Sequence, residues 1–246
     1  MSQKTYKIQD SIAGEKKSKM QRYMELVLGK TGMFDLIKYE LIMIFVSRIP
    51  GALGLFLRGK LYPLILGSVG KGTVFGANIV LRHPHKIFIG DGVIIDDNVL
   101  IDAKGVGNEG ITLGNEVFVG RNSILSCKDG NIILKDRANI GFNCEVFSSN
   151  NVVVGEDNLI AAYTYIVGGG NYNMDRTDIP INKQYDFEGK GGVELASDVW
   201  IGAHCMILDG VKIGQGSVIA AGAVVTKSID SMKIATGIPA KEVKNR

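Results

Sequence analysis

The chain has 246 residues and combines 32 Gly with only 5 Pro and 7% aromatic residues, which suits many tight corners around a core of small aliphatic side chains. Its 28 Lys and Arg and 25 Asp and Glu give a net charge of +3, and no nucleic-acid partner is expected. The three cysteines are scattered without a CxxC or Cys/His pattern, which excludes a zinc site of that kind and indicates free thiols in a reducing cytosol.

The charge is unevenly divided along the chain. Residues 1–70 hold 11 Lys and Arg and 5 Asp and Glu, a net charge of +6, whereas residues 71–246 hold 17 and 20, a net charge of −3, and the two sum to +3. A basic N-terminal part beside a mildly acidic body favours an anionic surface or ligand near the N-terminus. The alternative is an ordinary solvated helix surface. The polar first residues do not resemble a signal peptide, so a cytoplasmic location is expected.

The first 70 residues predict a polar arm, a helix over residues 20–28 and a strongly apolar segment over residues 33–69. Arg48, Arg58 and Lys60 interrupt the apolar segment, so it offers no uncharged run of the roughly 18 residues that a spanning helix needs. Two hydrophobic helices, broken at Pro50, are therefore expected. They would cap the open end of the next domain, or lie in a membrane interface with the three basic side chains reaching lipid phosphates, and both roles are compatible.

From Val74 onward, aliphatic residues recur at every sixth position. The pattern is clearest in the run Leu195, Ile201, Ile207, Ile213, Ile219 and Val225. A helix repeats at three or four residues and a strand at two, whereas a six-residue period indicates a solenoid in which each hexad is one short strand and a corner.

Three hexads make one triangular turn. The chain therefore predicts a parallel β-helix of about seven turns over residues 71–229, each turn rising about 4.8 Å. A long loop at residues 167–194 interrupts it, and a tail at residues 230–246 follows. Because Val, Leu and Ile fill the interior, any binding site must lie outside, on loops or between subunits.

The stretch SDVWIGAHCMILDGVKIGQGSVIAAGAVVTKSI, followed by IATGIPAKEVKNR, resembles the C-terminal signature of hexapeptide-repeat acyltransferases. Relatives of this kind include galactoside, maltose and serine O-acetyltransferases and enzymes that acetylate bacterial surface polysaccharides. The resemblance covers about residues 71–246. It implies an all-β, left-handed parallel β-helix, a homotrimer with acetyl-CoA held between neighbouring helices, a sugar or glycan acceptor, and no metal.

The resemblance also implies a set of cofactor-binding residues in the last two turns and the tail. Small residues would let the pantetheine arm of CoA lie against the turns, and lysines would neutralise its phosphates. The alternative is that the small residues only form tight corners and the lysines belong to a solvated tail. The set is Ala203, Ala221, Gly222, Thr226, Lys227, Lys241 and Lys244.

The catalytic position departs from the family pattern. In the family, the long loop after the fifth turn starts with a His that acts as general base on the acceptor hydroxyl. Here the loop reads GGGNYNMDR, with Asn171 or Tyr172 at that position. Neither is a good base near neutral pH, because a phenol titrates near ~10 and an amide does not titrate. His204, which lies beside Ala203, and a carboxylate such as Asp175 are the replacement candidates, with Tyr172 kept at the family position.

Only two other histidines exist, and the sequence places both far from this loop. His83 and His85 lie in RHPHK in the first turn, roughly 20 Å from the loop along one helix. The same spacing opposes a γ-type carbonic anhydrase, whose zinc needs three histidines.

Three residues are assigned to the acceptor. Asn143, in IGFNCEV, matches an Asn that contacts sugar hydroxyls in the sugar acetyltransferases, and Asn171 and Arg176 belong to the loop. The alternative for Asn143 is a corner residue with a left-handed backbone.

The predicted function is an acyl-CoA-dependent O-acyltransferase that acetylates a sugar or a surface-polysaccharide precursor. It would be cytoplasmic and, through residues 33–69, peripheral at the inner face of the membrane. A catalytically silent β-helix scaffold is the alternative.

Overall fold

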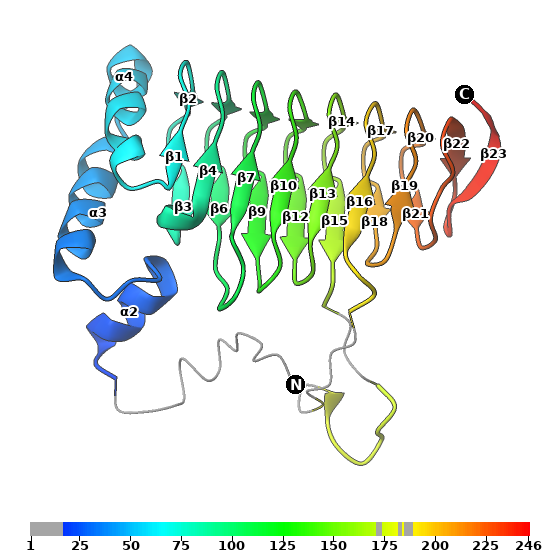
Figure 1. Cartoon of the computed structure of the whole chain (residues 1–246), viewed down its shortest axis with the longest axis horizontal. Coiled ribbons are helices and arrows are strands. Elements are labelled where there is room, and N and C mark those ends of the chain that lie inside the picture. The colour runs from blue at the N-terminus through cyan, green and yellow to red at the C-terminus, as the bar shows by residue number, and fades with distance from the viewer. Residues whose placement is uncertain (1–16, 171–173, 182–183, 185–188) are drawn as a thin grey trace.

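The structure is a computed structural model that describes residues 17–170, 174–181, 184 and 189–246. In this part of the chain, three α-helices precede a rod of short parallel strands (Figure 1). The helices are α2 (Lys19–Val27), α3 (Met33–Val46) and α4 (Gly51–Leu61). Pro50 is the N-cap of α4, so the expected break between two apolar helices is confirmed.

The described strands form three sheets, which make the three sides of the rod. Sheet A contains β1 (Ser68–Val69), β4 (Ile87–Ile89), β7 (Ile111–Leu113), β10 (Ile132–Leu134), β13 (Val152–Val154), β16 (Val193–Leu195) and β19 (Lys212–Ile213). Sheet B contains β2 (Val74–Phe75), β5 (Ile94–Ile95), β8 (Phe118–Val119), β11 (Asn139–Ile140), β14 (Leu159–Ile160), β17 (Trp200–Ile201), β20 (Val218–Ile219), β22 (Lys233–Thr236) and β23 (Lys241–Asn245). Sheet C contains β3 (Val80–Arg82), β6 (Leu100–Asp102), β9 (Ile124–Cys127), β12 (Glu145–Ser148), β15 (Tyr165–Gly168), β18 (Met206–Ile207) and β21 (Val224–Val225).

Each strand pairs in parallel with the strand one turn earlier and one turn later. In sheet B, for example, Ile140 lies beside Val119 on one side and Ile160 on the other. The exception among the described strands is the antiparallel pair β22 and β23, which closes the C-terminal end. The predicted solenoid of about seven turns is thus confirmed. Its first strand begins at Ser68, ahead of the expected boundary at residue 71.

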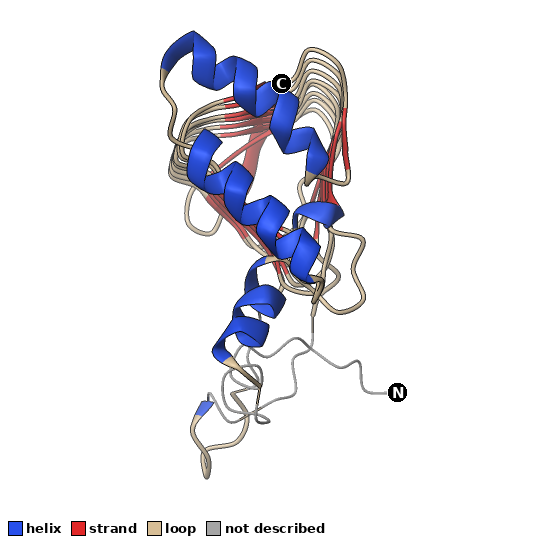
Figure 2. Ribbon diagram, turned by 90° about the vertical axis from the view of Figure 1, so that its left-hand side faces the viewer, coloured by secondary structure: helices blue, strands red, loops and turns tan. Residues whose placement is uncertain are grey.

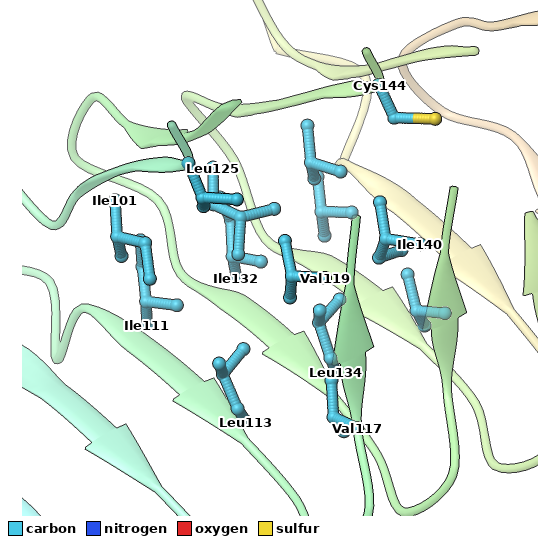
Figure 3. Close-up of a cluster of buried hydrophobic side chains, with 14 of the residues drawn as sticks. Ile101, Ile111, Leu113, Val117, Val119, Leu125, Ile132, Leu134, Ile140 and Cys144 are labelled. Atoms are coloured by element: carbon cyan, nitrogen blue, oxygen red, sulfur yellow. The ribbon is translucent and has the colours of Figure 1, made fainter. Parts of the chain in front are cut away.

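Aliphatic side chains fill the interior of the rod in stacked layers (Figure 3). Successive side chains of a strand point to opposite faces, so each short strand buries one or two of them. Val119, Ile140 and Leu125 are fully buried. Burying such a side chain contributes about 1.5–3 kcal/mol, so the six-residue repeat is the main source of stability of the rod.

The helices cover the N-terminal end of the rod (Figure 2). Backbone carbonyls of the helical segment accept hydrogen bonds from N–H groups at the edge of the first turn. Asn78 N–H donates to Ser47 O at 2.8 Å, and His83 N–H donates to Val27 O at 2.7 Å. Tyr39 adds a side-chain hydrogen bond to the carbonyl of Leu81 at 2.7 Å.

Arg58 turns inward, so the expectation that it reaches lipid phosphates is wrong. Its side chain is 2% exposed and donates to the carbonyls of Phe75, Val46 and Ile49 at 2.9, 3.3 and 2.7 Å. Gly54 leaves room for this, because a Cβ there would lie 2.7 Å from an Arg58 nitrogen and 1.8 Å from the Ile49 oxygen. The guanidinium thus donates both to carbonyls at the break between α3 and α4 and to the first strand of sheet B.

Candidate active site

The candidate site lies where the chain passes from sheet B to sheet C, a position named here the B/C corner. One residue per turn adopts the left-handed backbone conformation there, and these residues stack in a column along the rod. The column consists of Asn78, Asn98, Asn122, Asn143, Tyr163, His204 and Gly222, with φ between 54° and 73°. Asn and Gly adopt this conformation easily, whereas a bulky residue such as Tyr163 is an outlier that calls for a functional reason.

Tyr163 and His204 occupy consecutive turns of this column and stack face to face. Their ring centroids are 4.9 Å apart and their planes differ by 2°. Both residues are exposed, and Tyr163 retains 56% of its accessible surface. The stack fixes the imidazole against the rod while leaving its edge open to a ligand. Sequence analysis missed Tyr163, although aligning the corners turn by turn places it between Asn143 and His204.

The residue after each column position points inward and is held by the next turn. Ser123, Cys144, Thr164 and Cys205 donate to carbonyls of the following turn at 2.8, 3.2, 3.2 and 3.1 Å. Burial raises the pKa of the Cys205 thiol, and Cys205 is 2% exposed. This thiol is therefore a structural group and no nucleophile, although it is the neighbour of His204.

Small residues line the B/C corner beside His204. Gly222 N–H donates to Ala203 O at 2.8 Å, so Ala203 and Ala221 lie on consecutive turns of the same edge. A Cβ at Gly222 would meet no atom within 4 Å, and its φ is +73°. The surface here is open and flat, with backbone groups within reach of an extended ligand.

The C-terminal tail returns to this corner. Val224 donates to Gly237 O at 3.1 Å and accepts from Ala240 N–H at 2.8 Å, which brings Lys241 beside the last turn. Lys241 and Lys244 are exposed on β23.

Thr226 and Lys227 are exposed where the chain leaves sheet C, at the other end of β21. The predicted cofactor residues thus lie in the last two turns and the tail: Ala203, Ala221 and Gly222 at the B/C corner, Thr226 and Lys227 beyond β21, and Lys241 and Lys244 on β23 of sheet B.

The long loop leaves the rod where the chain passes from sheet C to sheet A, named here the C/A corner. Asp209 anchors its return, because its carboxylate accepts from Lys190 N–H at 2.6 Å and from Gly192 N–H at 2.8 Å. Within the loop, Arg176 Nε donates to Asp178 at 3.0 Å, and Gln184 donates to Arg176 O at 2.6 Å. Sequence analysis missed Asp209, which is 7% exposed.

The rod keeps His204 and the loop apart within one chain. The strand between the B/C and C/A corners is β15 or β18, and a four-residue strand such as β15 spans about 13 Å. Figure 1 shows the described part of the loop, which includes the exposed Asp175 and Arg176, projecting clear of the rod. Asn171 and Tyr172 lie outside the described residues. Asn143 lies half-buried in the His204 column, two turns away, in the left-handed conformation expected of a corner.

His83 and His85 belong to the N-terminal end and do not meet His204. His83 is 5% exposed, and its Nδ1 lies 3.6 Å from the buried carboxylate of Asp102. Lys104 donates to the same carboxylate at 2.8 Å. Burial raises the pKa of Asp102, but the adjacent imidazole of His83 and the hydrogen-bonded ammonium of Lys104 outweigh it and leave the pKa below its usual value. Among the described residues, no three His, Cys, Asp or Glu side chains gather as a metal site would require.

Comparison with known proteins relates this fold and corner to acyltransferases. A family model described as bacterial transferase hexapeptide (six repeats) matches residues 192–227. A probable acetyltransferase of Mycobacterium tuberculosis, Rv3034c, is 29% identical over 171 residues, which cover 68% of this chain and 54% of that protein. Residues 192–227 therefore carry the hexapeptide-repeat pattern of that family model, and the chain spans about half the length of the mycobacterial relative.

Two solved structures share the fold. A mutant of AntD, an N-acyltransferase from Bacillus cereus in complex with dTDP-4-amino-4,6-dideoxyglucose and coenzyme A, has a TM-score of 0.51 and 26% identity over 77% of this chain and 89% of that one. The polySia specific acetyltransferase NeuO has a TM-score of 0.55 and 27% identity over 72% of this chain and 79% of that one.

Proposed function

We propose that the chain is an acyl-CoA-dependent acyltransferase that acetylates a hydroxyl group of a sugar or of a surface-polysaccharide precursor in the cytoplasm. The observation that carries the proposal is the B/C corner, where the stacked and exposed imidazole of His204 borders a strip of small residues. The likeness to acyltransferases with sugar ligands supports the same class of acceptor.

Acetyl-CoA would lie along the last two turns. An extended pantetheine arm needs a surface without side chains and with available backbone groups, as Ala203, Ala221 and Gly222 provide. The phosphates need positive charge, which Lys227, Lys241 or Lys244 would supply as exposed ammonium groups. Thr226 would lie near the adenosine part, by the resemblance to the family.

His204 is the proposed general base. An imidazole nitrogen would take the proton of the acceptor hydroxyl as its oxygen attacks the thioester carbonyl carbon. The C–O bond forms, the C–S bond breaks, and CoA leaves as a thiolate that recovers the proton. Tyr163 would act as a positioning residue, because its ring restricts the imidazole to one plane. Asp175 and Tyr172 remain the alternative catalytic candidates on the loop.

A homotrimer would complete the site. Within one chain, the width of sheet C separates His204 from the point where the loop leaves the rod, so Arg176 would serve the His204 corner of a neighbouring subunit. By the resemblance to the family, Asn171 would contact the same acceptor. Asn143, in the same column as His204, would contact the acceptor hydroxyls. This arrangement follows the family resemblance, in which CoA lies between neighbouring helices.

A silent scaffold is the second candidate, and the sequence of the loop favours it. The position of the family's base holds Asn171 or Tyr172. His83 and His85 belong to the first turn, at the opposite end of the rod from the proposed CoA-binding residues. Such a protein would bind CoA without transferring an acyl group.

The test is a thiol-release assay with acetyl-CoA and a panel of acceptors. The panel contains nucleotide sugars, matching amino sugars and oligosaccharide fragments, and CoA binding is measured in parallel by calorimetry. The proposal predicts CoA binding and thiol release with a hydroxyl acceptor. Thiol release only with amino sugars would show that the acceptor group is an amine. CoA binding without thiol release for any acceptor in the panel would favour the silent scaffold.

A further inference from the structure

We infer that the outer face of the helical cap docks on the surface of an anionic lipid bilayer. This inference rests on the N-terminal end of the molecule and is independent of the proposed acyltransferase activity. The cap face is defined by apolar side chains that point away from the rod, namely Phe34, Ile37, Leu41, Ile44, Phe45, Leu53 and Phe56.

Helix α3 is apolar on two opposite sides. Leu36, Tyr39 and Ile42 face the rod and are 6–8% exposed. On the other side, Phe34 and Phe45 are 77% and 65% exposed. Figure 2 shows α3 and α4 side by side across the end of the rod, so their outer sides form one surface. A helix that is apolar all round needs a second apolar environment, which water does not provide.

Basic side chains frame the cap face. The ammonium of Lys38 lies 5.9 Å from the ring centroid of Phe34, and that of Lys60 lies 6.0 Å from the ring centroid of Phe56. Arg48 is exposed at the end of α3. Lysines above aromatic rings can bury their stems in the acyl boundary while their charges reach headgroup phosphates. Protein interfaces, by contrast, are depleted in Lys.

A cavity of about 120 Å³ opens beside the same surface. Its lining includes Lys30, Lys38 and His85, together with Leu64, which is 56% exposed. The carboxylate of Asp35 also lines the cavity, 3.9 Å from the ammonium of Lys38, so the two lysines leave a net positive lining that suits the phosphate of a lipid headgroup. Residues 1–70 carry a net charge of +6, which adds long-range attraction to an anionic surface.

The cap face would lie on the bilayer without crossing it. No helix in the described part of the chain combines the length and apolar character of a membrane span. The rod would then project from the membrane with its last turns and the B/C corner facing the cytoplasm.

The test is flotation of the full chain with vesicles made of equal parts phosphatidylglycerol and phosphatidylcholine. We expect the wild-type chain to float, and Phe45→Ser/Phe56→Ser to lower its partition coefficient by about tenfold or more. Phe and Ser have similar helix propensities and both sites are exposed, so the variant keeps the fold, which circular dichroism checks. Val106→Ser, at a 65% exposed apolar residue between β6 and β7, is the matched control and should float like the wild type.

A second pair of variants, Arg48→Gln and Lys60→Gln, tests the contribution of positive charge to vesicle binding. Each should reduce binding by about fivefold on the anionic vesicles and change nothing on pure phosphatidylcholine. A wild-type chain that stays at the bottom with both vesicle types overturns the inference. So does a double serine variant that floats as well as the wild type. Loss of an oligomer in the serine variant without vesicles, seen by light scattering, would show instead a protein interface and also overturn it.

Discussion

The two ends of the rod use polar side chains in opposite ways. At the N-terminal end, Arg58 and Asp102 are both 2% exposed and are held by carbonyls or by Lys104. At the B/C corner of the later turns, His204 and Tyr163 are exposed and contact each other. Buried polar groups whose hydrogen bonds are formed within the protein stabilise the cap. Polar groups that are exposed to solvent and held in place by a neighbouring ring are available for chemistry. Histidines at both ends therefore differ in burial and in role, as their places in the sequence led us to expect.

The largest effect is expected from breaking the buried end. Arg58→Ala removes the side-chain donor to three carbonyls and opens a hole under α4, so we expect a loss of about 3–5 kcal/mol in the free energy of unfolding. Denaturant titration followed by circular dichroism measures it. Arg48→Ala, on the exposed side of the same cap, should cost less than about 0.5 kcal/mol. Equal losses in the two variants would contradict the account of the cap.

A smaller effect is expected where the loop rejoins the rod. Asp209→Ala removes the acceptor of two backbone N–H groups, so we expect a loss of about 1–3 kcal/mol and faster proteolysis within residues 169–192. Asp198→Ala is the control, because its ion pair with Arg246 at 2.9 Å is exposed and should contribute less than about 1 kcal/mol. An Asp209 variant as stable as the control would show that the carboxylate does not anchor the loop.

The pH dependence of stability distinguishes the two ends further. Burial and the charge of Lys30 lower the pKa of His85 to about 4, below the ordinary value of about 6.5. Because the unfolded chain binds this proton more readily, stability should fall as the pH drops from about 6.5 to about 4. The half-exposed site reduces the effect to about 1 kcal/mol through solvent screening. Thermal unfolding of His85→Gln across this range should lack that decline, and an unchanged decline would assign it to other groups.

Asp102 should act at lower pH and with the same sign. Its folded-state pKa lies below the unfolded value, so its contribution is present above about pH 4 and is lost as the pH falls through the folded-state value. The two groups thus predict two separate steps of acid destabilisation at the N-terminal end.

The smallest effect is expected at the exposed corner. Tyr163→Leu removes the ring against which His204 stacks, so we expect about a fivefold lower turnover with CoA affinity unchanged. Tyr163→Phe keeps the stack and should keep the rate. Steady-state thiol release measures both variants, and equal rates in Tyr163→Leu and the wild type would remove the positioning role.

Sequence periodicity predicted the rod well because burial repeats at a fixed interval. The positions of Ile201 and Ile207, both inward and buried, follow from counting sixes. The count begins at Val74 and so omits β1, although Val69 lies six residues before Phe75. It also could not show that Arg58 turns inward, since a long basic side chain on an apolar helix fits either the carbonyls or the lipid.

The candidate site was predicted only in part. The small residues and lysines of the last turns follow from the signature, and the structure gathers them around sheet C. Aligning the corners places Tyr163 one turn before His204, but the face-to-face contact of the two rings did not follow, because it depends on side-chain orientation. Whether the loop reaches the corner depends on a neighbouring subunit, which one sequence does not place.

The central claim is that His204, and neither of the other two histidines, takes the proton of the acceptor. The most direct measurement compares thiol release by His204→Ala and His85→Gln with that of the wild type, using an accepted sugar and saturating acetyl-CoA. The account predicts a loss of about 10²–10⁴-fold in turnover for His204→Ala, with CoA binding retained, and little change for His85→Gln. Undiminished turnover in His204→Ala would contradict it and move the base to the loop.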